Sequence, residues 1–80
     1  MPQAIWKDQV AVITGASSGL GKAIARHLAA QEVKLALFDL NEQALEGLKK
    51  EIGGDCQVFG LDITKEEAVQ KAVDHVGEIF

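Results

Sequence analysis

Three glycines within seven residues, with two serines between them, could bind a phosphate group in this sequence. The segment reads Thr14-Gly15-Ala16-Ser17-Ser18-Gly19-Leu20-Gly21. A bound phosphate needs backbone N–H groups that face outward and a backbone that it can approach closely, and glycine permits both. We therefore expect this segment to be a turn between a strand and a helix that binds a pyrophosphate.

Each glycine of this turn has its own expected role. Gly15 lets the chain turn sharply off a strand, Gly19 leaves room where a pyrophosphate approaches the backbone, and Gly21 lets the helix pack close to the sheet. The N–H groups of Ser18, Gly19 and Leu20 are expected to face the phosphates, helped by the helix dipole, and the two serine hydroxyls add donors. The alternative is a strand-to-helix turn that only uses glycine for its conformation.

The spacing of the glycines departs from two common phosphate-binding loops. The Walker loop has four residues between its first glycine and Gly-Lys-Ser/Thr, whereas five residues separate Gly15 from Gly21, and Ala23 replaces the magnesium-binding hydroxyl. The G-x-G-x-x-G spacing also fails, because three residues lie between Gly15 and Gly19. The sequence therefore does not predict a nucleoside triphosphatase.

The segments around the turn predict strands and helices in alternation. Short apolar runs at residues 10–13 and 35–38 are typical of strands buried in a parallel sheet, and residues 57–59 are predicted to form a third strand. Helices are predicted from Leu20 to about Gln31, after an Asn41 cap, and after a capping box of Thr64 and Glu67. The inner faces are expected to be Leu20, Ala23, Ile24, His27, Leu28 and Gln31, then Ala44, Leu45, Leu48 and Ile52, then Val69, Ala72, Val73, Val76 and Phe80. The result is an α/β fold, a three-layer, doubly wound parallel sheet with strand order 3-2-1.

The pattern T-G-x-x-x-G-x-G resembles the first turn of the short-chain dehydrogenase/reductase (SDR) family. Residues 14–21 match it without departure, and residues 10–13 are similar to the family's first strand. The resemblance covers about residues 8–80 and implies the N-terminal, NAD-binding portion of a Rossmann-like fold. It implies an oxidoreductase that transfers hydride between a nicotinamide cofactor and a small-molecule alcohol or ketone, and a complete protein that forms a homo-oligomer.

The choice of cofactor is expected to depend on Asp39, which ends the second predicted strand 18 residues after Gly21. An acid at that place accepts hydrogen bonds from the adenine ribose hydroxyls, and its charge repels a 2′-phosphate. Family members that prefer the phosphorylated cofactor usually carry a base where this chain has Ser18 or Leu40. We therefore expect NAD. Asp39 could instead serve as a capping acid near Asn41, and the two roles are compatible.

A second acid, Asp62, follows the third predicted strand. The resemblance implies that its carboxylate accepts an N–H from the adenine amino group and that Ile63 packs on the adenine ring. The alternative is that Asp62 only stabilises the turn before Thr64. The predicted cofactor-binding residues are therefore Gly15, Ser17, Ser18, Gly19, Leu20, Gly21, Asp39, Leu40, Asp62 and Ile63.

Composition excludes several other classes of protein. The 80 residues are 48% hydrophobic and 25% charged, which is typical of a globular chain, and the net charge of −4 suits neither nucleic acid nor an anionic membrane. No apolar run reaches the roughly 20 residues of a membrane span, and the first residues do not resemble a signal peptide. The lone Cys56 can form neither an internal disulfide nor a metal site, so we expect a cytoplasmic protein without a metal. We also expect His27 to be packed and Trp6 to anchor the N-terminal segment.

The sequence contains no tyrosine. The family transfers protons with a Tyr-x-x-x-Lys pair, so the resemblance implies that these 80 residues hold no catalytic residue and do not oxidise alcohols alone. We interpret residues 1–80 as the N-terminal part of a dinucleotide-binding domain that stops before the catalytic portion. The exposed apolar surface is then expected at the open edge of residues 10–13 and on the third helix. The alternative is a non-catalytic nucleotide-binding or interaction module that is complete at 80 residues.

Overall fold

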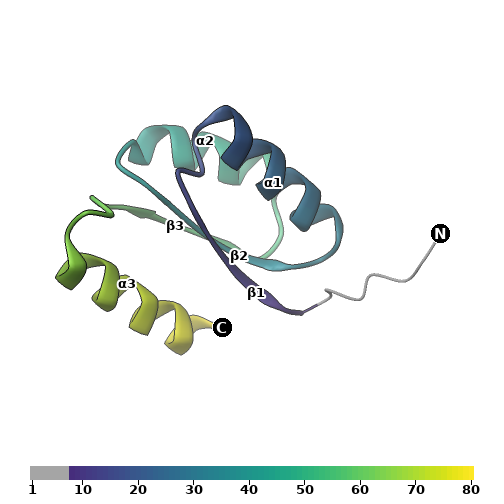
Figure 1. Cartoon of the computed structure of the whole chain (residues 1–80). Helices are drawn as coiled ribbons and strands as arrows, with labels where there is room; N and C mark the ends of the chain where they lie inside the picture. Colours follow the sequence, from purple (N-terminus) through teal and green to yellow (C-terminus); the bar gives the residue numbers. More distant parts are fainter. Residues whose placement is uncertain (1–7) are drawn as a thin grey trace.

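Three strands and three helices alternate along the chain, as the hydrophobic pattern predicts (Figure 1). The structure is a computed structural model and describes residues 8–80, so the role predicted for Trp6 lies outside the described residues. The elements are β1 (Val10–Thr14), α1 (Gly19–Ala30), β2 (Lys34–Asp39), α2 (Glu42–Ile52), β3 (Cys56–Gly60) and α3 (Glu66–Ile79). The predicted segments are confirmed, with small differences at their ends.

The sheet is parallel, and its strand order is β1-β2-β3. This is the predicted order 3-2-1, read from the opposite edge. In the register, Thr14 lies beside Phe38 and Asp39 lies beside Gly60. Helices α1 and α2 cover one face and α3 covers the other, which gives the three expected layers (Figure 1). Because the strands are parallel, the loops that follow them all leave from one edge of the sheet.

The central strand β2 forms the middle of the core because both of its faces are covered. Its side chains from residue 35 to residue 38 are at most 1% exposed, which explains their unbroken apolar run. One cluster of buried residues lies between the sheet and the pair of helices α1 and α2, and it contains Ile13, Ala16, Ala25, Val33, Leu35, Leu37, Leu45, Leu48 and Cys56. A smaller cluster lies under α3 and contains Ala36, Phe38, Ala72 and Val76.

The inner face of α1 differs from the predicted one. Gly21 and Ala25 are buried, and Leu28 is half-buried. Four residues that were expected inside are exposed: Leu20, Ala23, Ile24 and His27. The prediction of a packed His27 is therefore wrong. The physical reason is that α1 lies against the glycine turn through its small residues, which turns the larger side chains outward.

The capping box predicted at the start of α3 does not form. The helix begins at Glu66, and Lys65 takes the N-cap position without a side-chain hydrogen bond. The N–H and hydroxyl of Thr64 instead donate to Asp62 Oδ1, over 2.9 and 2.6 Å. The prediction is wrong because a carboxylate two residues away accepts both donors of Thr64 before the helix begins.

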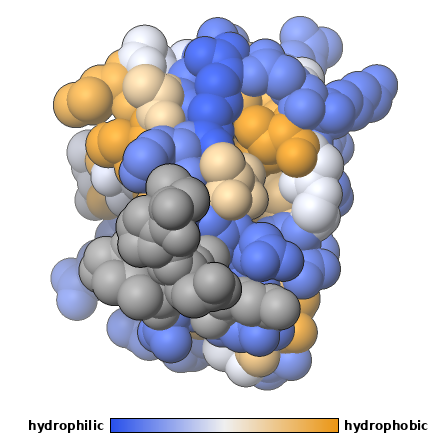
Figure 2. Space-filling view, turned by 90° about the vertical axis from the view of Figure 1, so that its right-hand side faces the viewer, coloured by the Kyte–Doolittle hydropathy of each residue, from blue (hydrophilic) through white to orange (hydrophobic). Residues whose placement is uncertain are grey.

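Apolar side chains are exposed along β1, which is one edge of the sheet, and on α3. Val10 and Val12 are 44% and 45% exposed. On α3, Ala72 and Val76 are buried as predicted, whereas Val73 is 43% exposed rather than inside. Figure 2 shows apolar side chains among polar ones on the side of the molecule from which β1 begins. None of the helices within residues 8–80 has the length and hydropathy needed to cross a membrane.

We predict that Leu45→Ala lowers the free energy of unfolding by about 2–5 kcal/mol, because Leu45 is fully buried between α2 and the sheet. Chemical denaturation followed by circular dichroism measures the change. Leu40→Ala is the matched control, since it deletes the same atoms from a side chain that is 72% exposed, and it should change stability by less than about 0.5 kcal/mol. Equal losses in the two variants would contradict this description of the core.

Candidate functional site

The glycine turn connects β1 to α1 at the carboxyl edge of the sheet. Gly15 has a φ of +62°, which residues with a side chain rarely adopt, so the sharp turn depends on glycine there. The Ser18 hydroxyl donates to the Gly15 carbonyl over 2.6 Å and accepts from the Gly21 N–H over 3.2 Å. Ser18 is therefore the N-cap of α1, and its hydroxyl stabilises the turn.

The N–H groups of the turn differ in whether they are available to a ligand. The Ser18 N–H donates to the Gly15 carbonyl over 3.0 Å, so it does not face outward as the sequence predicts. Within residues 8–80, the N–H groups of Gly19 and Leu20 have no acceptor. They lie in the first turn of α1, where the helix dipole favours a negative charge. Of the three N–H groups predicted to face a phosphate, those of Gly19 and Leu20 are therefore the two that are open to an anion.

Gly19 and Gly21 differ in what surrounds them. A Cβ at Gly19 would meet no atom within 4 Å, so the space beside it is open to a ligand. A Cβ at Gly21 would lie 2.2 Å from the Gly15 carbonyl oxygen and 2.8 Å from the Ala16 Cα. Both contacts are with backbone, so α1 can start where it does only with glycine at this position. The close approach is to the turn itself, rather than to the sheet as expected.

The Asp39 carboxylate lies at the carboxyl end of β2, beside the glycine turn. Its Oδ2 accepts from the Ser17 N–H over 3.0 Å and from the Ser17 hydroxyl over 2.6 Å, while Oδ1 accepts from the Asn41 N–H over 3.3 Å. The hydrogen bond from the Ser17 hydroxyl is the largest cause that lowers the pKa of Asp39, and burial opposes it. Asp39 does not cap α2, because Asn41 does so by accepting from the Ala44 N–H over 3.0 Å. Asp39 is therefore a fixed, ionised acid at neutral pH.

The Asp62 carboxylate is held in the same way at the carboxyl end of β3. Its Oδ1 accepts from both the N–H and the hydroxyl of Thr64, and the hydroxyl hydrogen bond is the largest cause that lowers the pKa of Asp62. The turn-stabilising role left open by the sequence is thus present. Oδ2 of Asp62 accepts no hydrogen bond from the described residues, so a second role is compatible with the first.

A pocket of about 190 Å³ brings together loops that follow all three strands. It is lined by Gly15, Asp39, Leu40, Leu61, Asp62, Ile63 and Thr64. Leu40 and Ile63 are apolar yet 72% and 50% exposed, so a flat apolar group could pack against them beside the two acids. Five of the ten predicted site residues line this pocket, and a sixth, Ser17, binds Asp39. The other four form the adjoining turn and the start of α1.

Two lining residues, Leu61 and Thr64, were not predicted from the sequence. Thr64 follows Asp62 by two residues, a spacing at which a hydroxyl can donate to an acid, but the capping-box pattern favoured another partner. The contact of Ser17 with Asp39 was also missed. It joins residues that are 22 positions apart, and only the parallel register of β1 and β2 places them side by side.

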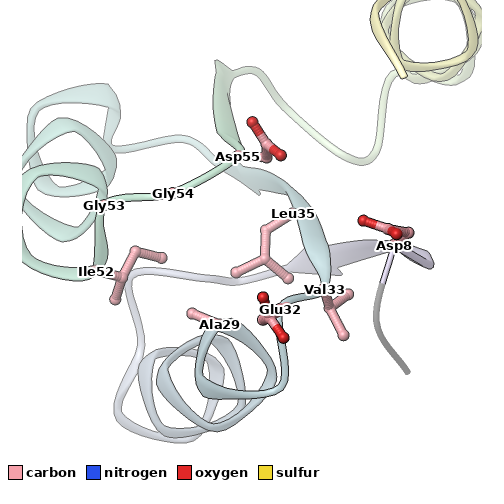
Figure 3. Close-up of a pocket in the computed structure, with 9 residues that line it drawn as sticks. All are labelled: Asp8, Ala29, Glu32, Val33, Leu35, Ile52, Gly53, Gly54 and Asp55. Carbon is pink, nitrogen blue, oxygen red and sulfur yellow. The ribbon is translucent and has the colours of Figure 1, made fainter. Parts of the chain in front are cut away.

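A second pocket, of about 220 Å³, lies at the opposite end of the strands, where β2 and β3 begin (Figure 3). Its lining includes three carboxylates and several apolar side chains: Asp8, Glu32, Asp55, Ala29, Val33, Leu35 and Ile52. None of the predicted site residues lines it, and the open N–H groups of Gly19 and Leu20 lie at the other end of the strands. Residues 8–80 contain no group of three or more His, Cys, Asp or Glu side chains that could hold a metal ion. We therefore place the candidate site at the carboxyl edge.

The fold and this edge of the sheet are those of a Rossmann-like dinucleotide-binding unit, in which the ligand lies across the carboxyl ends of parallel strands. Comparison with protein families agrees: the model described as "short chain dehydrogenase" matches residues 9–80. The chain belongs to this family, as the T-G-x-x-x-G-x-G pattern predicts.

Individual relatives are similar over most of this chain. The D-threitol dehydrogenase of Mycolicibacterium smegmatis is 39% identical over 75 residues, which cover 90% of this chain and 29% of that enzyme. The 3-ketoacyl-(acyl-carrier-protein) reductase of Brucella melitensis, solved with NADH, is 35% identical with a TM-score of 0.81, over 86% of this chain and 28% of that one. A metagenomic short-chain oxidoreductase, solved with NADP, is 33% identical with a TM-score of 0.82, over 88% of this chain and 33% of that one. The chain thus spans about a third of the length of the curated relatives it matches.

We predict that Gly21→Ala lowers the free energy of unfolding by about 3 kcal/mol, because the added Cβ would collide with the backbone of the glycine turn. Gly47→Ala is the matched control: it lies within α2 with open space around it, and it should raise stability by about 0.5–1 kcal/mol. Thermal unfolding of the two variants measures both effects. A Gly21→Ala protein as stable as the Gly47→Ala protein would refute the close approach.

Proposed function

We propose that this chain is the NAD-binding part of an oxidoreductase that transfers hydride between a nicotinamide cofactor and an alcohol or ketone. One observation carries the proposal: the glycine turn and an ionised acid lie side by side at the carboxyl ends of the strands. Gly19 has free space beside it, and Asp39 is hydrogen-bonded to Ser17 of the same turn. Membership of the short-chain dehydrogenase family supports it. The nicotinamide ring supplies the hydride chemistry when the cofactor is bound.

The phosphate and ribose parts of such a cofactor fit the residues present. The Gly19 and Leu20 N–H groups, which have no acceptor among the described residues, would bind the pyrophosphate. The open space at Gly19 would admit it. Oδ1 of Asp39, which accepts a long hydrogen bond from the Asn41 N–H, would also accept from the ribose hydroxyls.

The adenine ring fits the pocket beyond the ribose. Leu40 and Ile63 would pack against its faces, since both are exposed and line that pocket. Oδ2 of Asp62 would accept an N–H of the adenine amino group. The Thr64 hydroxyl would keep Asp62 in place by holding its other oxygen.

The proposed preference for NAD over NADP follows from the charges at the ribose end of the site. The ionised Asp39 would lie near the 2′-phosphate of NADP and repel it. The two positions at which the family usually carries a base for that phosphate are Ser18 and Leu40 here, and neither can be cationic. Of the two solved relatives described above, one is complexed with NADH and the other with NADP, so this preference rests on the residues of this chain.

The rest of the reaction is assigned to the complete protein. Because the 80 residues contain no tyrosine, we assign them no catalytic residue and expect no NADH from secondary alcohols with these residues alone. A small-molecule alcohol or ketone, a homo-oligomeric assembly and a cytoplasmic location are proposed for the complete protein, and the buried, free Cys56 fits a reducing compartment. A non-catalytic module is not favoured, because an oxidoreductase is 39% identical over 90% of the chain.

We predict that the complete protein binds NAD more tightly than NADP, as measured by calorimetry. Gly19→Val should weaken NAD binding by about tenfold or more, because the new side chain occupies the open space where the pyrophosphate would lie. Asp39→Ala should weaken NAD binding and bring the two affinities closer together. Gly47→Val makes the same change in open space on α2 and should leave both affinities unaltered.

Different results would contradict different parts of the proposal. Unchanged NAD affinity in the Gly19→Val protein would remove the phosphate-binding role of the turn. A wild-type preference for NADP would remove the role given to Asp39. NADH formation from secondary alcohols by the 80 residues alone would contradict the absence of catalytic groups.

A further inference from the structure

The Ser17 hydroxyl has one proton, and it donates that proton to Oδ2 of Asp39 over 2.6 Å. The Ser17 backbone N–H donates to the same oxygen over 3.0 Å. One residue thus supplies two donors to one carboxylate oxygen, while Oδ1 accepts the Asn41 N–H over a longer 3.3 Å. The hydroxyl that the sequence assigns to a phosphate is therefore directed to the acid instead.

The backbone holds both partners of this contact in place. The Ala16 N–H donates to the Phe38 carbonyl over 3.2 Å, and both of these residues are fully buried. They immediately precede Ser17 and Asp39, so the two side chains start from fixed positions. The Asp39 side chain is only half-buried and could otherwise rotate between staggered conformations. The Ser17 hydroxyl selects one of them.

We propose that Ser17 is a positioning residue that fixes the Asp39 carboxylate for the hydroxyls of the adenine ribose and thereby sets the preference for NAD over NADP. This inference rests on the proposed cofactor function. Ser17 acts through Asp39: because it occupies Oδ2, the oxygen left for the ribose is Oδ1.

A fixed carboxylate and a mobile one differ most in how they treat the two cofactors. The fixed one presents its acceptor to the ribose hydroxyls without losing rotational freedom on binding. It also cannot rotate away from the 2′-phosphate of NADP, so the repulsion between the carboxylate and the phosphate is not relieved. Loss of the Ser17 hydroxyl should therefore weaken NAD binding and relieve the exclusion of NADP at the same time.

The test compares Ser17→Ala with Ser17→Thr in the complete protein. Calorimetry measures the Kd of each variant for NAD and for NADP. In Ser17→Ala, the ratio of the NADP Kd to the NAD Kd should fall by about tenfold, the scale of one hydrogen bond to a charged group. Ser17→Thr keeps the hydroxyl and should keep the ratio. Gln70→Ala is the matched control, because it removes a hydrogen bond of 3.0 Å to the carboxylate of Asp74 on α3 and should leave the ratio unchanged.

A double variant tests whether Ser17 acts through Asp39. In an Asp39→Asn background, Ser17→Ala should not change the ratio further, because the carboxylate on which it acts is gone. An NMR titration of the Asp39 carboxyl without cofactor gives an independent readout: its pKa should rise in Ser17→Ala, since the Ser17 hydroxyl is the largest cause that lowers it.

The outcomes separate this inference from the function on which it rests. A wild-type protein that binds neither cofactor contradicts the proposed function and this inference with it. A wild-type preference for NAD that Ser17→Ala leaves intact contradicts the positioning role alone. Equal weakening of NAD and NADP in Ser17→Ala, or a further fall of the ratio in the Asp39→Asn background, would also overturn it, because either would mean that Ser17 does not act through the acid.

Discussion

Parallel pairing of β1, β2 and β3 brings the loops that follow all three strands to one edge of the sheet. The glycine turn leaves from β1, Asp39 ends β2, and Asp62 follows β3, so residues far apart in the sequence line one pocket. The burial of β2 on both faces keeps this register, because a slip of one residue would turn each of its side chains away from the cluster that it fills and toward the opposite face. The position of the site is therefore a consequence of how the core is packed.

At the carboxyl ends of the strands, serine and threonine hydroxyls hold the two acids, while the first N–H groups of α1 have no acceptor among the described residues. Asp39 and Asp62 each have one oxygen held by the hydroxyl and N–H of a single residue, Ser17 or Thr64. The first N–H groups of α1 instead remain available to an anion. A chain of net charge −4 could hold the proposed dinucleotide site in this way: the nearby N–H dipoles would act directly on the phosphates, whereas charges more than about 8–10 Å away are screened by salt.

The order of elements and the place of the turn followed from the sequence because each has a local signal, such as the apolar run of β2 or the Asn41 cap. The strand order followed from the rule that consecutive strands joined by short right-handed crossovers pair side by side. The rotation of α1 about its axis could not be predicted from the sequence. It depends on the close approach of Gly21 to the backbone of the folded turn, and this contact outweighs the apolar spacing of the helix. The start of α3 was misplaced because Thr64 had two possible partners, and the carboxylate two residues earlier accepts both of its donors. The Ser17 contact depends on tertiary register and has no local pattern.

A crystal structure of the encoded protein with NAD bound tests the account most directly. The pyrophosphate should lie at the Gly19 and Leu20 N–H groups, and the ribose hydroxyls should donate to Oδ1 of Asp39 while Ser17 still donates to Oδ2. The adenine should lie in the pocket lined by Leu40 and Ile63. A cofactor bound at the opposite edge of the sheet, or an Asp39 carboxylate that has left Ser17 to reach the ribose, would contradict it.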